Sequence, residues 1–245
     1  MASPQPWQFA NFPSEPTYLL FWEDFETTSG ADSAATWLTL GWTLTVKTAG
    51  TAVTGDTDGV NGIVTLATTA ADNNGPQLQR LSETFSLSTG KNTKFLARLQ
   101  HSIVLTDTWS IGLALTDTTI QHATDGTLAN VTDCTDFIGF CKPEADTSVY
   151  GIIRRDGTQA ATGALATLAN ATNVVLGFEV RMDPTTAGTG SVVFSINGVN
   201  VAVLNSITLP YSAEETLAPG VALTARSATG SSMVVDYIGA MQTPR

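Results

Sequence analysis

The chain has 245 residues, of which 42% are apolar and 13% are charged, and its formal net charge is −11. This length suits one large all-β domain or two small ones, and the apolar fraction is ample for a continuous core. Because proteins bind phosphate backbones and anionic lipids through clustered Lys and Arg, the acidic balance argues against nucleic-acid and membrane-surface partners.

The first 17 residues form a segment of distinct composition. They contain four prolines, a density that blocks both helices and central strands. We therefore expect an extended arm over residues 1–17, followed by a folded domain over residues 18–245. Disordered tails are usually poor in aromatic residues, so the aromatics here are candidate anchors for a partner protein. The candidate partner-binding residues are Trp7, Phe9, Phe12, Pro13 and Pro16. A disordered tail, or an arm packed on its own domain, also fits this composition.

No targeting signal is evident near the start of the chain. No basic residue precedes Lys47, and no apolar run approaches the roughly 20 residues of a membrane-spanning helix. We expect no secretory signal and no membrane anchor, and folding in a cytoplasm. The two cysteines agree, because an extended segment between Cys134 and Cys141 would hold their Cα atoms about 23 Å apart. Two reduced structural thiols are favoured over a disulfide or a metal pair.

The first half of the chain contains apolar segments separated by turn clusters. In one of them, alternate side chains from Phe95 to His101 share one face, as in a half-buried strand. Gly41 interrupts another alternating segment and suggests a β-bulge there. The strands expected in this half cover residues 19–26, 37–47, 63–67, 77–87, 95–104 and 109–115, and the last of these is expected to be central.

The strongest hairpin signal is Asn197-Gly198, because a type I′ turn needs positive φ at both central residues. With a two-residue turn, the apolar residues on both sides fall into cross-strand pairs that share the buried face. The expected pairs are Ile196 with Val199, Phe194 with Val201, and Val192 with Val203.

Further strands follow the same pattern in the second half. They are expected over residues 137–141, 149–155, 174–182, 192–204, 221–224 and 233–241. No convincing run has a helical period. Many short strands separated by turn signals predict an all-β chain that forms an antiparallel β-sandwich.

Three segments of the second half occur in a familiar order: residues 176–180, the hairpin at 193–199, and residues 234–238 with the sequence Val-Val-Asp-Tyr-Ile. In this order the chain resembles the concanavalin A-like (laminin-G-like) jelly roll. The resemblance implies a jelly-roll β-sandwich. It says little about activity, because that fold hosts lectins, hydrolases and structural proteins.

A narrower resemblance rests on residues 58–66, 75–79, 112–117 and 136–140, which look like segments of virion structural proteins of tailed bacteriophages. Within that group the chain resembles capsid decoration (cement) proteins. The resemblance implies a protein of the virion that binds the major capsid protein on the outside of the head, commonly as a homotrimer. A proline-rich arm ahead of a rigid sandwich suits such a clamp, because three arms in a trimer would add avidity.

The carboxylates do not reproduce the pattern of sandwich glycosidases, which place Glu, Asp and Glu on one face of a strand. Here Asp24 and Glu26 share a face and Glu23 lies on the other. Residues 56–62 look faintly like a calcium loop, but Ala67 stands where an EF-hand requires Glu. We therefore expect no catalytic residues, no metal and no cofactor.

The remaining candidates are histidines and tryptophans. His101 and His122 are too scattered to argue for a Ser-His-Asp group, and His101 is expected to be a satisfied core or rim histidine. Aromatic residues on strands mostly pack in the core, but four could line a sugar-stacking platform: Trp22, Trp37, Trp42 and Trp109. The sequence thus predicts a non-enzymatic capsid decoration protein. The alternative is a lectin-like carbohydrate-binding module with a head-fibre or host-attachment role, and a glycoside hydrolase ranks third.

Overall fold

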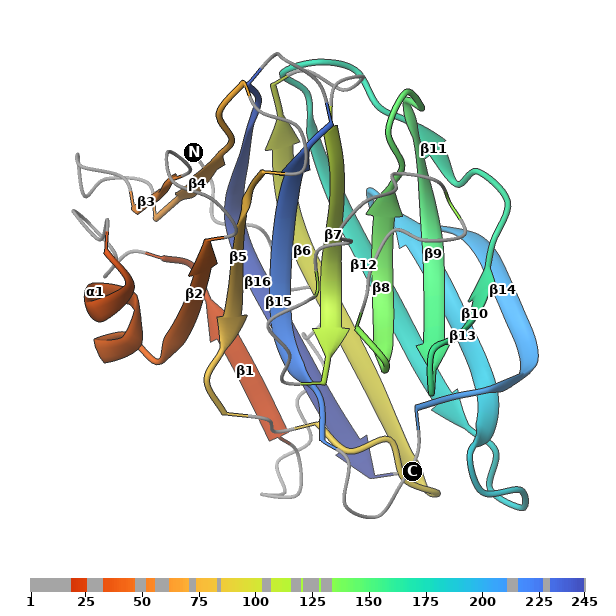
Figure 1. Cartoon of the computed structure of the whole chain (residues 1–245). Coiled ribbons are helices and arrows are strands. Elements are labelled where there is room, and N and C mark those ends of the chain that lie inside the picture. Colours follow the sequence, from red (N-terminus) through yellow and green to blue (C-terminus); the bar gives the residue numbers. More distant parts are fainter. Residues whose placement is uncertain are drawn as a thin grey trace.

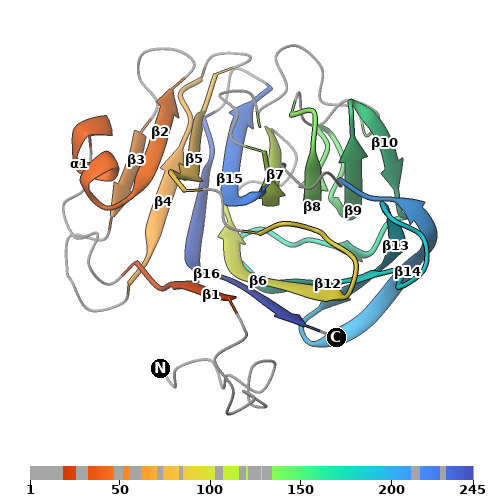
Figure 2. The same ribbon diagram turned by 90° about the horizontal axis from the view of Figure 1, so that it is seen from below.

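Two antiparallel β-sheets stack face to face in the computed structural model of this chain (Figure 1). The structure describes residues 19–25, 33–46, 52–55, 62–70, 74–82, 85–102, 107–115, 120, 128, 134–210, 216–226 and 230–244. Figure 2 shows the two sheets as separate layers, with β14 and β10 on the same side of the sandwich. The predicted all-β antiparallel sandwich is confirmed.

Sheet A has the strand order β14-β13-β12-β6-β16-β4-β3, and β1 also pairs with β16. Its strands are β1 (Leu19–Glu23), β3 (Ala52–Gly55), β4 (Val64–Ala67), β6 (Lys91–His101), β12 (Asn173–Met182), β13 (Thr189–Ile196), β14 (Val199–Thr208) and β16 (Ser232–Pro244).

Sheet B has the strand order β10-β9-β8-β7-β15-β5-β2, and β11 pairs with β9. Its strands are β2 (Trp42–Val46), β5 (Pro76–Arg80), β7 (Asp107–Ala114), β8 (Phe137–Lys142), β9 (Ser148–Arg155), β10 (Thr158–Ala161), β11 (Ala166–Thr167) and β15 (Ala218–Ala225).

The core lies between the sheets and is built from the alternate side chains that the strand pattern predicted. Phe95 and Phe178, on neighbouring strands of sheet A, stack with ring centroids 5.0 Å apart. Phe140 of sheet B meets Phe194 of sheet A edge to face at 5.4 Å. Such pairs contribute about 0.5–1.5 kcal/mol each beyond the area that they bury, so this aromatic group helps to hold the two layers together.

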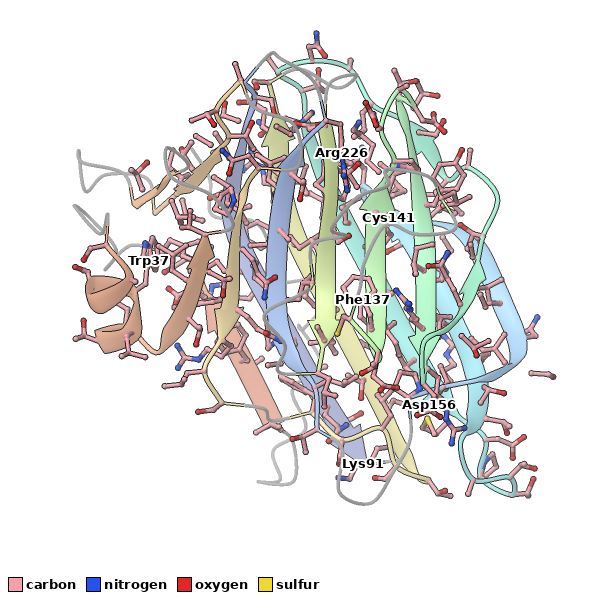
Figure 3. All side chains as sticks on the ribbon, viewed as in Figure 1. Trp37, Lys91, Phe137, Cys141, Asp156 and Arg226 are labelled. Carbon is pink, nitrogen blue, oxygen red and sulfur yellow. The ribbon has the colours of Figure 1, made fainter. Side chains whose placement is uncertain are left out.

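The outer face of sheet B is also covered. Every residue of β7, β8 and β15 is buried, which a sheet with one face in water would not allow. On that outer side Phe137 and Cys141 of β8 (labelled in Figure 3) pack in a second apolar cluster with Ile120. The central part of this face is therefore closed to a ligand in the present conformation.

One segment predicted as strand is partly helical. Residues 34–39 form the short helix α1 (Ala34–Thr39), which begins after Ser33, whose hydroxyl accepts a hydrogen bond from the Thr36 backbone N–H. Gly41 has a φ of +80°, so it ends the helix in the left-handed conformation and does not mark a bulge. Within the described residues α1 is the longest helix, and its six residues cannot cross a membrane.

The Asn197-Gly198 hairpin forms with the predicted turn but with a different register. Both turn residues have positive φ, and Ile196 lies opposite Val199 as expected. A β-bulge at Val201 then shifts the pairing by one residue, so the expected pairs of Phe194 with Val201 and of Val192 with Val203 are wrong. Phe194 pairs instead with Ala202, and Val192 with Leu204. The slip moves Val203 to the outer face, opposite Val193, and leaves Val201 unpaired in the bulge; both are exposed, and so is Val199 beside the turn.

The other strand predictions agree with the structure to within a few residues, with two kinds of exception. The strand expected at residues 77–87 ends at Arg80, and Phe85 forms only an isolated bridge. The short strands β3, β10 and β11 were not predicted. Cys134 and Cys141 are both buried and are not bonded to each other, and burial raises the pKa of Cys141 well above its ordinary value. That they are reduced thiols stays a prediction.

Candidate functional site

The structure separates the four tryptophans that were grouped as a possible sugar platform. Trp37, Trp42 and Trp109 are fully buried in the core, so they cannot stack on a ligand. Trp22 alone among the four is accessible, with 38% of its surface exposed. It lies on β1, where its neighbour Phe21 packs against the core and Trp22 points to the outer face of sheet A.

Trp22 stacks on a second aromatic residue, Tyr237 of β16. The ring centroids are 5.0 Å apart and the planes are inclined by 21°. Tyr237 is itself buried in a small apolar cluster with Leu96 and Met241, outside the main core. Burial raises the pKa of the Tyr237 phenol to about 12. The indole is thus supported on one side by a fixed aromatic ring and is open to solvent over part of its surface.

A β-bulge in β16 explains why Tyr237 faces outward. Val235 pairs with Leu99 and Tyr237 with Arg98, so Asp236 is an extra residue between them. Simple alternation after the buried Val235 would direct Tyr237 into the core. Bulges often redirect a side chain beside a functional site. Here the bulge brings Tyr237 and Asp236 to the same side as Trp22.

Charged groups border the two aromatic rings. Arg98 donates a hydrogen bond to the Asp236 carboxylate at 2.7 Å, and both side chains are partly exposed. The pKa of Asp236 is raised because burial penalises its charged form; the charge of Asp24 adds to this, and Arg98 partly offsets it. We call Trp22, Tyr237, Arg98, Asp236 and Asp24 the Trp22 platform.

The Trp22 platform combines the groups that a saccharide requires. An exposed indole can stack on the apolar face of a sugar ring, and carboxylate and guanidinium groups can hydrogen-bond to its hydroxyls. On the next strands Glu179 accepts a hydrogen bond from Arg181 at 2.9 Å. Burial alone would raise the pKa of Glu179, but this bond and the charge of Lys94 lower it. Charges of both signs thus lie on the outer face of sheet A.

The carboxylates considered from the sequence fall into different places. Glu23 turns toward the core side, where it accepts hydrogen bonds from the Phe25 backbone N–H and, at 3.4 Å, from Trp42 Nε1. Asp24 lies near Asp236, as its effect on the Asp236 pKa shows. Glu26 lies outside the described residues, and so do residues 56–61 of the predicted turn. Among the described residues, no group of three or more His, Cys, Asp or Glu side chains is placed to hold a metal ion.

A second polar cluster is buried between the sheets. The Asp107 carboxylate bonds through one oxygen to His101 Nε2, at 2.6 Å, and to the Ser231 hydroxyl. Its other oxygen lies 3.5 Å from Lys142 Nζ, which also donates to the backbone oxygens of Asp107 and Pro143. His101, Asp107 and Lys142 are all inaccessible to solvent.

This cluster is not a nucleophilic triad, because Asp107 stands in the middle where His would be required. It joins β6 and the residue before β16, in sheet A, to β7 and β8 in sheet B, and we assign it a structural role. Burial lowers the pKa of Lys142, and the neighbouring Asp107 charge opposes that shift. His101 is a core histidine as expected, with Nε2 bonded; its Nδ1 has no hydrogen-bond partner among the described residues.

The arm residues proposed from the sequence as partner anchors lie outside the described residues. They are Trp7, Phe9, Phe12, Pro13 and Pro16. Their role therefore stays a prediction, as does the boundary between the arm and the domain.

Comparison with known proteins identifies the fold and no closer relationship. No protein-family model and no curated protein matches the chain. Solved structures do match. The protein of unknown function SO2946 from Shewanella oneidensis MR-1 has a TM-score of 0.57 at 13% identity, covering 100% of this chain and 95% of its own. An endo-β-1,4-glucuronan lyase from the fungus Trichoderma reesei has a TM-score of 0.55 at 10% identity, covering 90% and 94%. The carbohydrate recognition domain of Emp46p has a TM-score of 0.54 at 10% identity, covering 82% and 88%.

The chain is therefore a concanavalin A-like jelly-roll sandwich, a fold that it shares with lectins and with polysaccharide-cleaving enzymes. This confirms the broader resemblance found in the sequence. The comparisons give no support to the narrower one, the capsid decoration proteins.

The expectation that the chain is not an enzyme is corrected by the same comparisons. A glucuronan lyase, an alginate lyase and a glycosyl hydrolase family protein share this fold at about 10% identity. The missing Glu-Asp-Glu pattern excludes one catalytic design on the fold and does not exclude catalysis.

Proposed function

We propose that this protein binds a saccharide at the Trp22 platform. The observation that carries the proposal is the partly exposed indole of Trp22, held against Tyr237 and bordered by Arg98 and Asp236. Aromatic residues on strands usually lie in the core, as the other three candidate tryptophans do.

The similar structures support this proposal at the level of the fold. One of them is a carbohydrate recognition domain and another acts on a glucuronan. The partly exposed Arg98 favours a saccharide that carries carboxylates, because a guanidinium can hydrogen-bond to a carboxylate through two of its N–H groups. We therefore expect acidic polysaccharides to bind better than neutral ones.

The test is a glycan array followed by titration calorimetry with the strongest binder. Burial of an aromatic side chain contributes about 1.5–3 kcal/mol, so Trp22→Ala should weaken binding by roughly ten- to a hundredfold. Leu81→Ala is the matched control, since Leu81 is an exposed apolar residue outside the platform, and it should bind as the wild type does. An array without a hit, or equal binding by Trp22→Ala, would refute the proposal.

Cleavage of the bound saccharide is a second candidate function. It is favoured by the two carboxylates Asp236 and Asp24 on the Trp22 platform and by the burial that raises the pKa of Asp236, because acid–base cleavage uses two carboxyl groups in different environments. Asp236→Asn should then abolish product formation and leave binding within a few-fold of the wild type. Unchanged polysaccharide after long incubation with the wild-type protein would exclude this candidate.

Attachment to a capsid stays a separate proposal, supported by the sequence segments at residues 58–66, 75–79, 112–117 and 136–140 that look like virion proteins. In this proposal the protein is a homotrimer on the virion exterior, and the arm over residues 1–17 contacts the major capsid protein. Deletion of that arm should leave a folded domain that no longer binds undecorated heads. Equal binding by the truncated and full-length proteins would disprove the role of the arm.

A further inference from the structure

One side of the sandwich is built from two long segments without any charge. Residues 157–178 and 184–213 contain no Asp, Glu, Lys or Arg, although the chain has 22 acidic and 11 basic residues. These segments supply β10, β11, β13, β14 and part of β12. In the sheet order β14 is the edge strand of sheet A and β10 the edge strand of sheet B, and both lie on the same side (Figure 2).

The edge strand β14 carries three exposed valines, which the bulge at Val201 distributes over both faces of the strand. Val199, Val201 and Val203 are exposed to 64%, 41% and 49%. The strand has ten residues and contains neither proline nor a charged side chain. Natural edge strands usually carry Lys, Pro or inward charges, which prevent a second chain from docking. β14 lacks these side-chain devices.

A cleft separates β14 from the edge of sheet B. It has a volume of about 400 Å³ and is lined on one side by Ile207 and Thr208 of β14 and on the other by residues of β9 and β10. Arg155 and Asp156 line it as well, and their side chains form an ion pair of 3.4 Å with each other. The lining residues of β10 are uncharged, and they are Thr158, Gln159 and Ala160. The cleft thus extends the neutral surface of β14 across the open side of the sandwich.

We propose that this edge, formed by β14, β10 and the cleft between them, docks a second copy of the same chain; its charged groups Arg155 and Asp156 neutralise each other. The net charge of −11 makes two copies repel each other over most of their surfaces. At this edge two copies can approach without bringing like charges together. The proposal is independent of saccharide binding, which uses the outer face of sheet A.

The size of the edge is sufficient for a stable contact. A strand of ten residues spans about 33 Å, and two stacked sheets are about 20 Å thick with their side chains. Their product is roughly 650 Å², close to the about 800 Å² per partner of a standard interface. The register breaks in the β13–β14 pairing bend the strand, so we infer packing of the valine side chains and no continuous ladder of backbone hydrogen bonds.

The test is sedimentation analysis of the full chain over a wide range of protein and salt concentrations. The wild type should reach the mass of two or more 25.7 kDa chains, and added salt should strengthen association because it screens the repulsion. The variant Val201→Lys/Val203→Lys should stay monomeric at protein concentrations at least tenfold above those at which the wild type associates. The control Leu38→Lys/Leu81→Lys changes two equally exposed apolar residues outside this edge and should associate as the wild type does.

Two outcomes would overturn the proposal. If the wild type is monomeric under all conditions, this edge does not bind a second copy of the chain. If the Val201→Lys/Val203→Lys variant associates as the wild type does, the contact between copies lies elsewhere. Circular dichroism checks that the lysine variant is folded. Val201→Thr/Val203→Thr serves as a second variant, because it keeps the branched Cβ that suits a strand and should weaken association without loss of fold.

Discussion

Replacing Lys142 with Met tests whether the buried cluster around Asp107 holds the two sheets together. The Lys142 side chain is fully buried, lies 3.5 Å from the Asp107 carboxylate and donates to two backbone oxygens. Removing one partner of a buried ion pair costs about 3–5 kcal/mol, because the remaining charge has lost its counterion. A domain is stable by about 5–15 kcal/mol in total, so Lys142→Met should remove a large share of the stability.

A double-mutant cycle separates the charge pair from the rest of the site. In Asp107→Asn/Lys142→Met no uncompensated charge remains, so the double variant should lose about 1–3 kcal/mol less than the sum of the single variants. Urea denaturation followed by the fluorescence of the buried Trp42 and Trp109 gives the free energy of unfolding. Lys94→Met, on the outer face of sheet A, is the surface control and should change stability by about 0.5 kcal/mol or less. Additive losses, or a Lys142→Met variant as stable as the control, would contradict the assigned role.

Three further predictions concern individual groups. Trp22→Ala should expose Tyr237 and lower the pKa of its phenol from about 12 toward the ordinary value of about 10. The pKa is measured by ultraviolet titration of the tyrosines, and the Tyr237→Phe variant identifies the signal of Tyr237. An unchanged pKa would mean that other residues bury the phenol. Arg98→Ala should raise the pKa of Asp236 further, because Arg98 lowers it. The pKa is followed through carboxyl chemical shifts measured against pH, and an unchanged value would contradict the ion pair. Cys134 and Cys141 should not react with a thiol reagent in the native protein and should both react after denaturation; rapid labelling of the native protein would contradict their burial.

The parts of the fold that the sequence predicted are those specified by local pattern. The strand β12 alternates regularly, β8 is a short apolar run between turns, and Asn197-Gly198 forms its turn with little help from the rest of the chain. Each of these signals lies within about ten residues, so no knowledge of the partner strand is needed.

The features that were missed depend on distant contacts or on weak local signals. Nothing in the sequence of β14 shows that a bulge occurs at Val201, because the bulge is a relation between two strands. Helix α1 has only six residues, too few to show a helical period, and its cap Ser33 resembles any loop serine. The strands β10 and β11 are short and consist of small or polar residues.

The candidate site was predicted only in part for the same reason. Trp22 was named among four tryptophans, but residues 19–22 are all apolar, so alternation cannot tell which of them face the core. The bulge that turns Tyr237 toward Trp22 depends on pairing with β6. The ion pair of Arg98 and Asp236 joins residues 138 positions apart. The buried cluster around Asp107 likewise brings together distant residues. Nothing in the sequence near Lys142 indicates that its side chain is buried.

The most direct test of the central claim is a titration of the labelled protein with an acidic oligosaccharide, followed through the indole N–H signals in the NMR spectrum. The Trp22 signal should shift progressively with ligand, because its ring forms the exposed platform, while the signals of Trp37, Trp42 and Trp109 in the core should stay in place. If other signals shift while the Trp22 signal stays in place, or if no signal shifts with any saccharide tested, the claim that this face binds sugar is contradicted.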